Sequence, residues 1–293
     1  MRITAITASQ DETQTLQRKT KMKKLMITVG LAALVAATSA VAQEKPAITI
    51  ATGMEGGGYH TNSVKMAERL KQRGYDSITV APTNGSDAIT LAACNGKADV
   101  WTAQIDAVYS RHKEGCSLEP VADYGTEKAF LLFPPNSDMD ELEDLTAENR
   151  VAVDGIGSGT ELFWKTIVSI ETGENGDKDD WAKAGMVESA PDLLNTMANF
   201  GDIHAAVLVR KPDSPHIQML LDQGWTLGYF WDRDIDDEIF NSLPLYASEK
   251  VAVKNSNGNQ QKNYVYNVRS FIGVSQKHKN DRKFKMDVAG AAN

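Results

Sequence analysis

The chain has 293 residues, with 31 Lys and Arg against 39 Asp and Glu, a net charge of −8 at pH 7, and two cysteines. An acidic chain argues against nucleic acid and anionic lipid surfaces as partners, although local backbone donors can still bind a small anion. The length is sufficient for one large domain or two of moderate size.

The N-terminus has the pattern of a secretory signal peptide. Lys21, Lys23 and Lys24 form a short positive region, and residues 25–41 are apolar or small and carry no charge. Residues 40–42, Ala-Val-Ala, fit a small-residue cleavage site. We therefore expect export to the periplasm. An uncleaved membrane anchor is the alternative, because the apolar run is near the lower length limit for a bilayer span.

The expected cleavage site defines the mature chain. We predict residues 1–21 to be an incorrectly assigned N-terminal extension, residues 22–42 to be the signal peptide, and Gln43 to be the first mature residue. Removing residues 1–42 takes six of the 31 basic and two of the 39 acidic residues, which leaves a net charge of −12. The mature protein is therefore expected to be acidic and soluble.

The first part of the mature chain alternates between short apolar strands and amphipathic helices. This alternation is typical of a parallel sheet with crossover helices. The predicted segments are a strand at 48–52, a helix at 59–73, a strand at 77–81, a helix at 85–95 and a strand at 99–102.

A second α/β unit follows. Residues 129–133 read as a strand that ends at Pro134 and Pro135, and the acidic, polar residues 136–150 are expected to cross between domains. The pattern then begins again. Its segments are a strand at 151–154, a glycine loop at 155–159, a helix at 160–172, a helix at 190–200, a strand at 203–209 and a returning strand at 265–276.

Each unit opens with a strand, a glycine loop and a helix, an arrangement that often holds an anion. Nucleotides are disfavoured as ligands of the first loop. Tyr59 and His60 stand where a P-loop requires Lys and Ser or Thr, and Thr61 stands where a dinucleotide fingerprint requires glycine. The histidines show no zinc-type spacing, so we expect no metal and no cofactor.

An enzyme is also disfavoured. A nucleophile elbow around Ser158 would need glycine at the positions of Ile156 and Thr160, so a hydrolase using Ser158 is the weaker alternative. Binding by backbone amides is favoured instead, because glycine lets the backbone approach a ligand and the first turn of a helix has unpaired N–H groups. Three strand-to-helix junctions offer such groups: Gly58-Tyr59-His60, Ser158-Gly159-Thr160, and the loop with Asn84, Gly85 and Ser86.

Four stretches of the chain are distinctive: "ITIATGMEGGGYH", "VAPTNGSDAITLAACNGKADVWTAQIDAV", "DLTAENRVAVDGIGSGTELFWKTI" and "FGDIHAAVLVRKPDSPHI". In order and spacing, they resemble the TAXI-type solute receptors of TRAP transporters. The resemblance covers about residues 46–225 and the return strand near Phe271. It implies a type II periplasmic binding fold with two α/β lobes, each a mainly parallel sheet flanked by helices.

The resemblance also implies a function and partners. The lobes, predicted as residues 43–135 plus 226–293 and residues 136–225, would close on a small organic anion such as glutamate or 2-oxoglutarate. A membrane permease of the TRAP type would take the ligand from a monomeric receptor without catalysis. A sensor that presents its ligand to a membrane histidine kinase is the alternative.

The ligand residues can be assigned by position in the resembling motifs. Glu55 departs from the pattern of the first loop and would repel an anion if it pointed inward, and Asp106 is expected to cap a helix. The implied ligand-binding set is Gly57, Gly58, Tyr59, His60, Asn84, Gly85, Ser86, Gln104, Gly157, Ser158, Gly159 and Thr160.

The two cysteines, Cys94 and Cys116, are the only ones in the chain. An even pair in an oxidising exported compartment favours a disulfide, and two unpaired thiols are the alternative.

Overall fold

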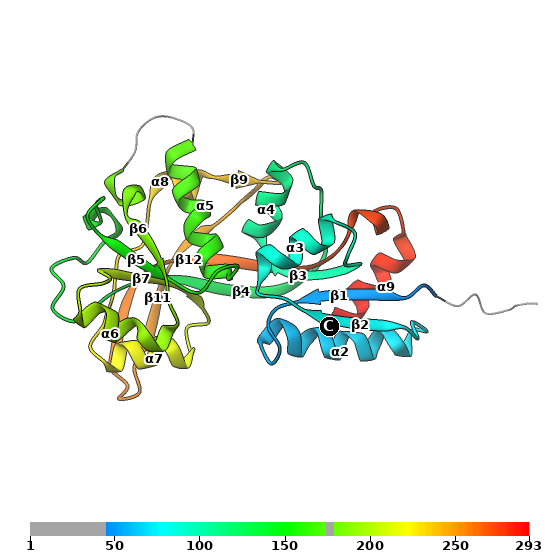
Figure 1. Ribbon diagram of the computed structural model, residues 1–293, viewed down its shortest axis with the longest axis horizontal. Coiled ribbons are helices and arrows are strands. Elements are labelled where there is room, and N and C mark those ends of the chain that lie inside the picture. The colour runs from blue at the N-terminus through cyan, green and yellow to red at the C-terminus, as the bar shows by residue number, and fades with distance from the viewer. Residues whose placement is uncertain (1–44, 174–178, 293) are drawn as a thin grey trace, which may run out of the picture. The chain divides into compact units, whose positions relative to one another are not determined.

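The computed structural model describes residues 45–173 and 179–292 (Figure 1). The predicted extension at 1–21 and the predicted signal peptide at 22–42 lie outside the described residues. Residues Pro46–Asn293 form one compact unit. Among the helices of the described ranges, none is both long and apolar enough to cross a bilayer.

The first α/β unit has the predicted order of strands and helices. Strands β1 and β2 run parallel with Ile50 opposite Val80, and β1 and β3 run parallel with Ile50 opposite Val100. We call this unit the first half. Its elements are β1 Ile48–Thr52, α2 Gly58–Gln72, β2 Ile78–Pro82, α3 Ser86–Cys94, β3 Val100–Gln104 and α4 Ile105–Lys113.

The second α/β unit also follows the prediction, with two local differences, of which one is the strand β6 Gly185–Glu188 that was not predicted. The helix expected at 190–200 is a 3₁₀ turn, η3 Pro191–Leu193, followed by the short α6 Leu194–Asn199. Pro191, the first residue of this turn, has no N–H to donate to the hydrogen bonds of a regular helix. We call this unit the second half. Its elements include β5 Arg150–Val153, α5 Gly159–Gly173, β6 Gly185–Glu188, β7 Ala205–Arg210 and α7 Pro215–Asp222.

Two long strands, β4 Glu119–Phe133 and β12 Gln260–Val274, join the halves. β4 pairs antiparallel with β12 at one end and with β7 at the other, and β12 also pairs with β3. The main path of the resulting ten-stranded sheet is β2-β1-β3-β12-β4-β7-β5-β6. One continuous sheet therefore runs through both halves (Figure 1).

The segments after α7 complete the sheet and the surface. β8 pairs with the end of β4, and β11 pairs with the first part of β12, from Gln260 to Asn267. The lobe boundaries predicted at residues 135 and 226 remain a prediction. The long strands β4 and β12 carry the sheet from one half to the other. These segments are β8 Thr226–Leu227, α8 Arg233–Asp237, β9 Ile239–Phe240, β10 Leu243–Pro244, β11 Ala247–Lys254 and α9 Arg282–Ala292.

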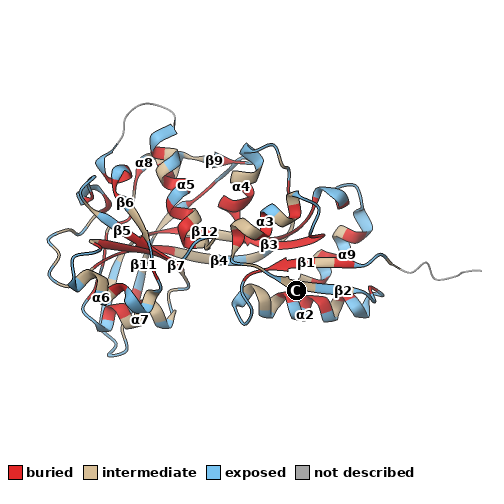
Figure 2. Cartoon of the chain, in the orientation of Figure 1, coloured by how far each residue is buried: buried red, intermediate tan, exposed pale blue. Residues whose placement is uncertain are grey.

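Helices cover both faces of the first half of the sheet. α2 and α9 bury Met66, Leu70 and Phe284 against Ile50 and Val100. α3 and α4 pack on the opposite face, where the main apolar core continues into the second half beneath α5. Figure 2 shows buried residues along the strands and along the sheet-facing sides of these helices. This packing fixes where the strands end and therefore where their loops meet.

Cys94 and Cys116 form a disulfide, with Cα atoms 5.9 Å apart. The bond joins the last residue of α3 to the turn that follows α4. It holds two neighbouring helices of the first half together.

Candidate functional site

Loops from the two halves meet at the carboxyl ends of the strands. The loop after β2 contains Gly85, and the loop after β5 contains Gly157. A Cβ atom built on Gly85 would lie 2.3 Å from the carbonyl oxygen of Gly157, and one built on Gly157 would lie 3.4 Å from Cβ of Asn84. These glycines therefore allow the two loops to touch directly.

Gln104 makes a second contact between the halves. A Cβ atom on Gly159 would lie 2.1 Å from Oε1 of Gln104, so the amide lies directly against the first residue of α5. The backbone N–H of Gln104 donates to Oγ of Ser86 at 3.2 Å. Gln104 is only 3 % exposed, and within the described residues its buried Oε1 has no hydrogen-bond partner.

Tyr59 connects the start of α2 to the long strand β12. Its hydroxyl is hydrogen-bonded to Oγ of Ser270 at 2.7 Å, and its ring meets the ring of Tyr124 edge-on at 4.9 Å. Burial, and then the charge of Glu127, raise the pKa of Tyr59 far above its ordinary value. Tyr59 is therefore a neutral phenol that links the first glycine loop to the two strands joining the halves.

The N-terminus of α2 has no side-chain cap. Gly57 precedes the helix without a capping hydrogen bond, and the first turn contains no acidic residue. His60 turns back to accept a hydrogen bond from the N–H of Gly56 at 3.3 Å. Glu55 is exposed at the surface. Among the described residues, no side chain caps the first-turn N–H groups of α2, and the dipole of a helix favours an anion at this end.

The N-terminus of α5 is occupied by its own side chains. Oγ of Ser158 accepts the N–H of Glu161 at 3.0 Å, and Oε2 of Glu161 accepts the N–H of Gly157 at 2.5 Å. Thr160 donates to Asp154 at 2.6 Å and accepts the N–H of Val209 at 3.1 Å. The second glycine loop is therefore a turn in which the hydroxyls of Ser158 and Thr160 and the N–H of Gly157 already have partners.

Three acidic residues with an ion pair or a raised pKa were not among the predicted ligand residues. Asp154 forms an ion pair with Arg210, at 2.9 Å, at the ends of β5 and β7. Asp106 is fully buried and accepts hydrogen bonds from the N–H of Ala107 at 2.8 Å and the hydroxyl of Tyr246 at 3.0 Å. Burial raises the pKa of Asp106 to about 7.

Glu127 is the third of these residues and lies in the middle of β4. Burial raises its pKa, while the charge of Arg210 and a hydrogen bond from Gln104 oppose the rise. Sequence reasoning missed Glu127 because one acidic residue in a half-polar segment is unremarkable. A usable signal was its register, since Glu127 shares a strand face with the buried Ala129 and Leu131.

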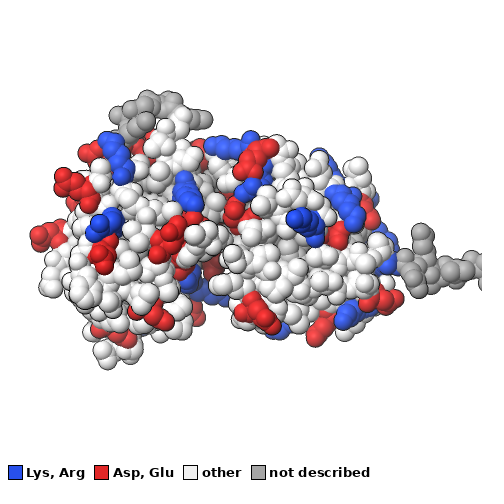
Figure 3. Space-filling model, viewed as in Figure 1, with Lys and Arg blue, Asp and Glu red and all other residues white. Residues whose placement is uncertain are grey.

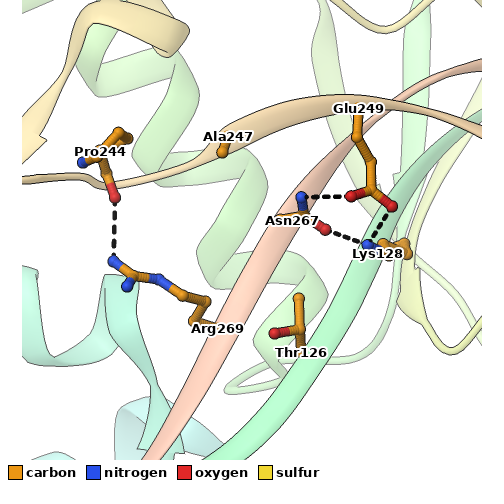
Figure 4. A pocket seen from close by; sticks show the side chains of 7 residues that line it. All are labelled: Thr126, Lys128, Pro244, Ala247, Glu249, Asn267 and Arg269. Carbon is orange, nitrogen blue, oxygen red and sulfur yellow. Dashed lines mark hydrogen bonds and ion pairs between the residues drawn. The ribbon is translucent and has the colours of Figure 1, made fainter.

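A cavity of about 340 Å³ lies on the other face of the long strands (Figure 4). In the wall of this cavity, the ammonium group of Lys128 donates hydrogen bonds to the side chains of Glu249 and Asn267. Arg269 donates to the carbonyl oxygen of Pro244 at 3.1 Å. Lys128 and Glu127 are consecutive in β4, so their side chains point to opposite faces. The predicted ligand residues do not line this cavity; its lining is Thr126, Lys128, Pro244, Ala247, Glu249, Asn267 and Arg269.

Charge on the surface is mixed. Figure 3 shows a hollow between the two halves in which Lys or Arg atoms are visible. Elsewhere, within residues 45–173 and 179–292, the carboxylates of Glu171, Asp179 and Asp232 lie within 4.8 Å of one another. Glu171 accepts the N–H of Asp179, and Asp232 accepts two N–H groups of α8. Backbone donors thus engage two of these three carboxylates.

No family model matches this sequence, and no curated protein does. Solved structures are similar to it. XAC2383 from Xanthomonas citri, bound to ATP, has 9% identity and a TM-score of 0.50, with 84% of this chain and 82% of that chain covered. The periplasmic aliphatic sulphonate binding protein SsuA from Escherichia coli has 14% identity and a TM-score of 0.49, with coverage of 85% and 69%.

A putative L-cystine ABC transporter protein from Listeria monocytogenes has 13% identity and a TM-score of 0.47, with coverage of 84% of this chain and 89% of that chain. At such low identities the likeness concerns the fold alone. The TAXI resemblance remains a prediction. This chain has a mixed α/β fold in which one sheet runs through two halves, and it shares this fold with XAC2383.

Proposed function

We propose that this protein is an extracytoplasmic solute receptor that binds a small organic anion between its two halves. The observation that carries the proposal is the direct contact of strand-end loops from both halves, at Gly85 with Gly157 and at Gln104 with Gly159. In open α/β sheets, ligands bind outside the carboxyl ends of the strands, where these loops lie.

The uncapped N-terminus of α2 is the proposed anion site. Gly58, Tyr59 and His60 bring three first-turn N–H groups to one place, and no side chain of the cap competes for them. The helix dipole adds about 0.3–1 kcal/mol for a charge at such a terminus. The N–H of Gly157 and the hydroxyls of Ser158 and Thr160 have partners inside their own half, so we propose that these groups position the loop rather than hold the anion.

Closure of the halves is the proposed binding motion. The long strands β4 and β12 are the connections around which two halves could swing, as in hinge closure of binding proteins. The glycine contacts describe the closed arrangement, in which water is excluded and the hydrogen bonds to a ligand strengthen. Ligand binding would thereby give the protein a closed shape that a membrane partner can recognise.

The proposed partner is the permease of a TRAP-type transporter, and the proposed location is the periplasm. Both follow from the sequence resemblance and from the signal-peptide pattern. We propose no catalysis. Ser158, the candidate nucleophile, accepts the N–H of Glu161, and no histidine contact of Ser158 occurs among the described residues. A serine needs an adjacent base to act as a nucleophile.

A thermal-shift screen of the purified protein against organic acids, amino acids, sugars and metal cations tests the proposal. A carboxylate present at one hundred times its dissociation constant should stabilise the folded protein by about 2.7 kcal/mol. A shift with sugars or cations but with no carboxylate would contradict the anion assignment.

A further inference from the structure

We propose that the cavity lined by Lys128 and Arg269 is a second binding site, separate from the anion site at α2, and that it takes a small oxyanion. The ligand class is phosphate, sulfate or a short carboxylate, which share oxygens that a guanidinium can hold in pairs. This site goes beyond the proposed function, because the predicted ligand residues do not line the cavity.

The floor of the cavity is a piece of the sheet made by three neighbouring strands. Lys128 of β4 lies opposite Asn267 of β12, which in turn lies opposite Ala247 of β11. Two residues along the same strands, Thr126 lies opposite Arg269. Residues that face each other across antiparallel strands share one face of the sheet, as do residues two apart along a strand. The strand register therefore gathers all five side chains on one face.

Arg269 is held in place on one side of this floor (Figure 4). Its Nη2 donates to the carbonyl oxygen of Pro244 at 3.1 Å, and its guanidinium carbon lies 5.5 Å from the centre of the Phe271 ring. A guanidinium has five N–H donors in a planar fork. Among the described residues, Arg269 uses only one of them and forms no ion pair. Most of its donors are therefore free for the oxygens of a ligand.

Lys128 lies on the other side of the cavity (Figure 4). Its ammonium group forms an ion pair with Glu249 and donates to the amide oxygen of Asn267. The lining thus contains two cations and one carboxylate, and that carboxylate is already paired. The charge of Arg269 remains uncompensated, so this cavity attracts an anion although the chain as a whole is acidic.

The size and charge of the cavity narrow the ligand class. Its volume of about 340 Å³ is at the lower end of the range for ligand pockets, about 300–1,000 Å³, which suits a small solute. Arg269 would repel an amine or a metal cation. A neutral sugar would accept hydrogen bonds from the guanidinium but would leave its charge uncompensated. An oxyanion satisfies both the donors and the charge.

Isothermal titration calorimetry of the purified protein tests the inference with inorganic phosphate, sulfate and succinate as probes. Chloride keeps the ionic strength constant, and glucose is the neutral comparison. At least one oxyanion should bind with a dissociation constant below about 1 mM, and glucose should not. Failure of all three oxyanions, or binding of glucose instead, would overturn the inference.

Variants assign the binding to this cavity. Arg269→Gln should weaken oxyanion binding about tenfold or more, and Arg269→Lys, which keeps the charge but loses the fork, should weaken it less. Arg282→Gln is the matched control, because Arg282 is an exposed arginine outside the cavity, and it should change nothing. Ala247→Leu leaves the guanidinium intact but fills the space above the floor, so it should also weaken binding. Circular dichroism checks the folding of each variant. Oxyanion binding that survives in folded Arg269→Gln would overturn the assignment.

A solute identified by the thermal-shift screen distinguishes the two sites. Protein saturated with that solute should still bind the oxyanion, and Arg269→Gln should leave affinity for the solute within about twofold. Competition between the two would overturn the second site and leave the proposed function standing. A screen that finds no solute, together with oxyanion binding that depends on Arg269, would count against the proposed function alone.

Discussion

Oε1 of Gln104 occupies the space that a side chain at Gly159 would need, since a Cβ atom built there would lie 2.1 Å from it. Gln104 ends β3 in the first half, and Gly159 begins α5 in the second. This close approach depends on the missing Cβ and not on an unusual backbone, because Gly159 has no positive φ. Gly155, four residues earlier in the same loop, has nothing within 4 Å of its built Cβ.

We predict that Gly159→Ala hinders closure. The added methyl group should push the Gln104 amide away and hold the halves apart, while the core of each half stays intact. Affinity for a carboxylate identified by the thermal-shift screen should fall about tenfold or more, and small-angle scattering with that ligand should show a larger radius of gyration than for the wild type.

Gly155→Ala is the matched control for this substitution, because it adds the same methyl group to the same loop in open space. It should leave both affinity and radius of gyration unchanged. Wild-type affinity in Gly159→Ala would show that the contact with Gln104 is not needed for binding.

Much of this architecture could be predicted from local pattern. The strand at Ile48–Thr52 has the predicted bounds, and three of the four helices predicted by residue range begin and end within two residues of their predicted positions. These segments have apolar residues at strand or helix spacing and are bounded by glycine or polar turns, so the sequence nearby decides their structure. The meeting of the strand-end loops also follows from general α/β topology.

The remainder depends on contacts between distant segments. Residues 119–128 are polar and contain proline and glycine, yet they extend β4, because β12 supplies a partner about 150 residues away in sequence. The same pairing places Glu127 opposite Val268, which is buried in the main core. Nothing near Glu127 in sequence distinguishes it from a surface acid. Local patterns also cannot show that Ser158 and Thr160 would find partners within their own half.

Ser158 allows a direct test of that last point. Ser158→Ala removes the acceptor for the N–H of Glu161 at the start of α5, so it should lower the free energy of unfolding by about 1 kcal/mol. Ligand affinity should stay within about twofold of the wild type, since the hydroxyl is used inside the protein. Urea denaturation and calorimetry measure the two effects, and Ser158→Thr, which keeps the hydroxyl, should restore stability. A large loss of affinity with unchanged stability would instead identify Ser158 as a ligand contact.

Asp106 should make stability depend on pH in an unusual direction. Burial raises its pKa from 3.8 to about 7, so between these values the folded protein retains a proton that the unfolded chain has released. The free energy of unfolding that Asp106 contributes should therefore fall as pH rises from about 4 to 7, and level off above.

Asp106→Asn tests this dependence by removing the titration while keeping an oxygen for the N–H of Ala107. Relative to the wild type, the variant should gain at least about 1.4 kcal/mol between pH 4 and pH 8, the free energy of one pKa unit. Chemical denaturation across this range measures it. The exposed Asp123→Asn is the control and should follow the wild-type curve. Parallel curves for Asp106→Asn and the wild type would show that Asp106 ionises normally.

The disulfide between Cys94 and Cys116 should stabilise the protein without taking part in binding. It links residues 22 positions apart. A cross-link that closes a loop of that size lowers the conformational entropy of the unfolded chain, which stabilises the folded protein by about 3 kcal/mol. Replacing both residues by serine should lower the free energy of unfolding by about 2–4 kcal/mol in urea denaturation. A reductant should have the same effect on the wild type and none on the double variant.

Cys94 ends α3, whereas Ser86 at the other end of the helix belongs to the candidate site, so ligand affinity should be retained at temperatures where the variant is folded. Loss of binding by the folded variant would mean that the bond also positions the loop at Ser86.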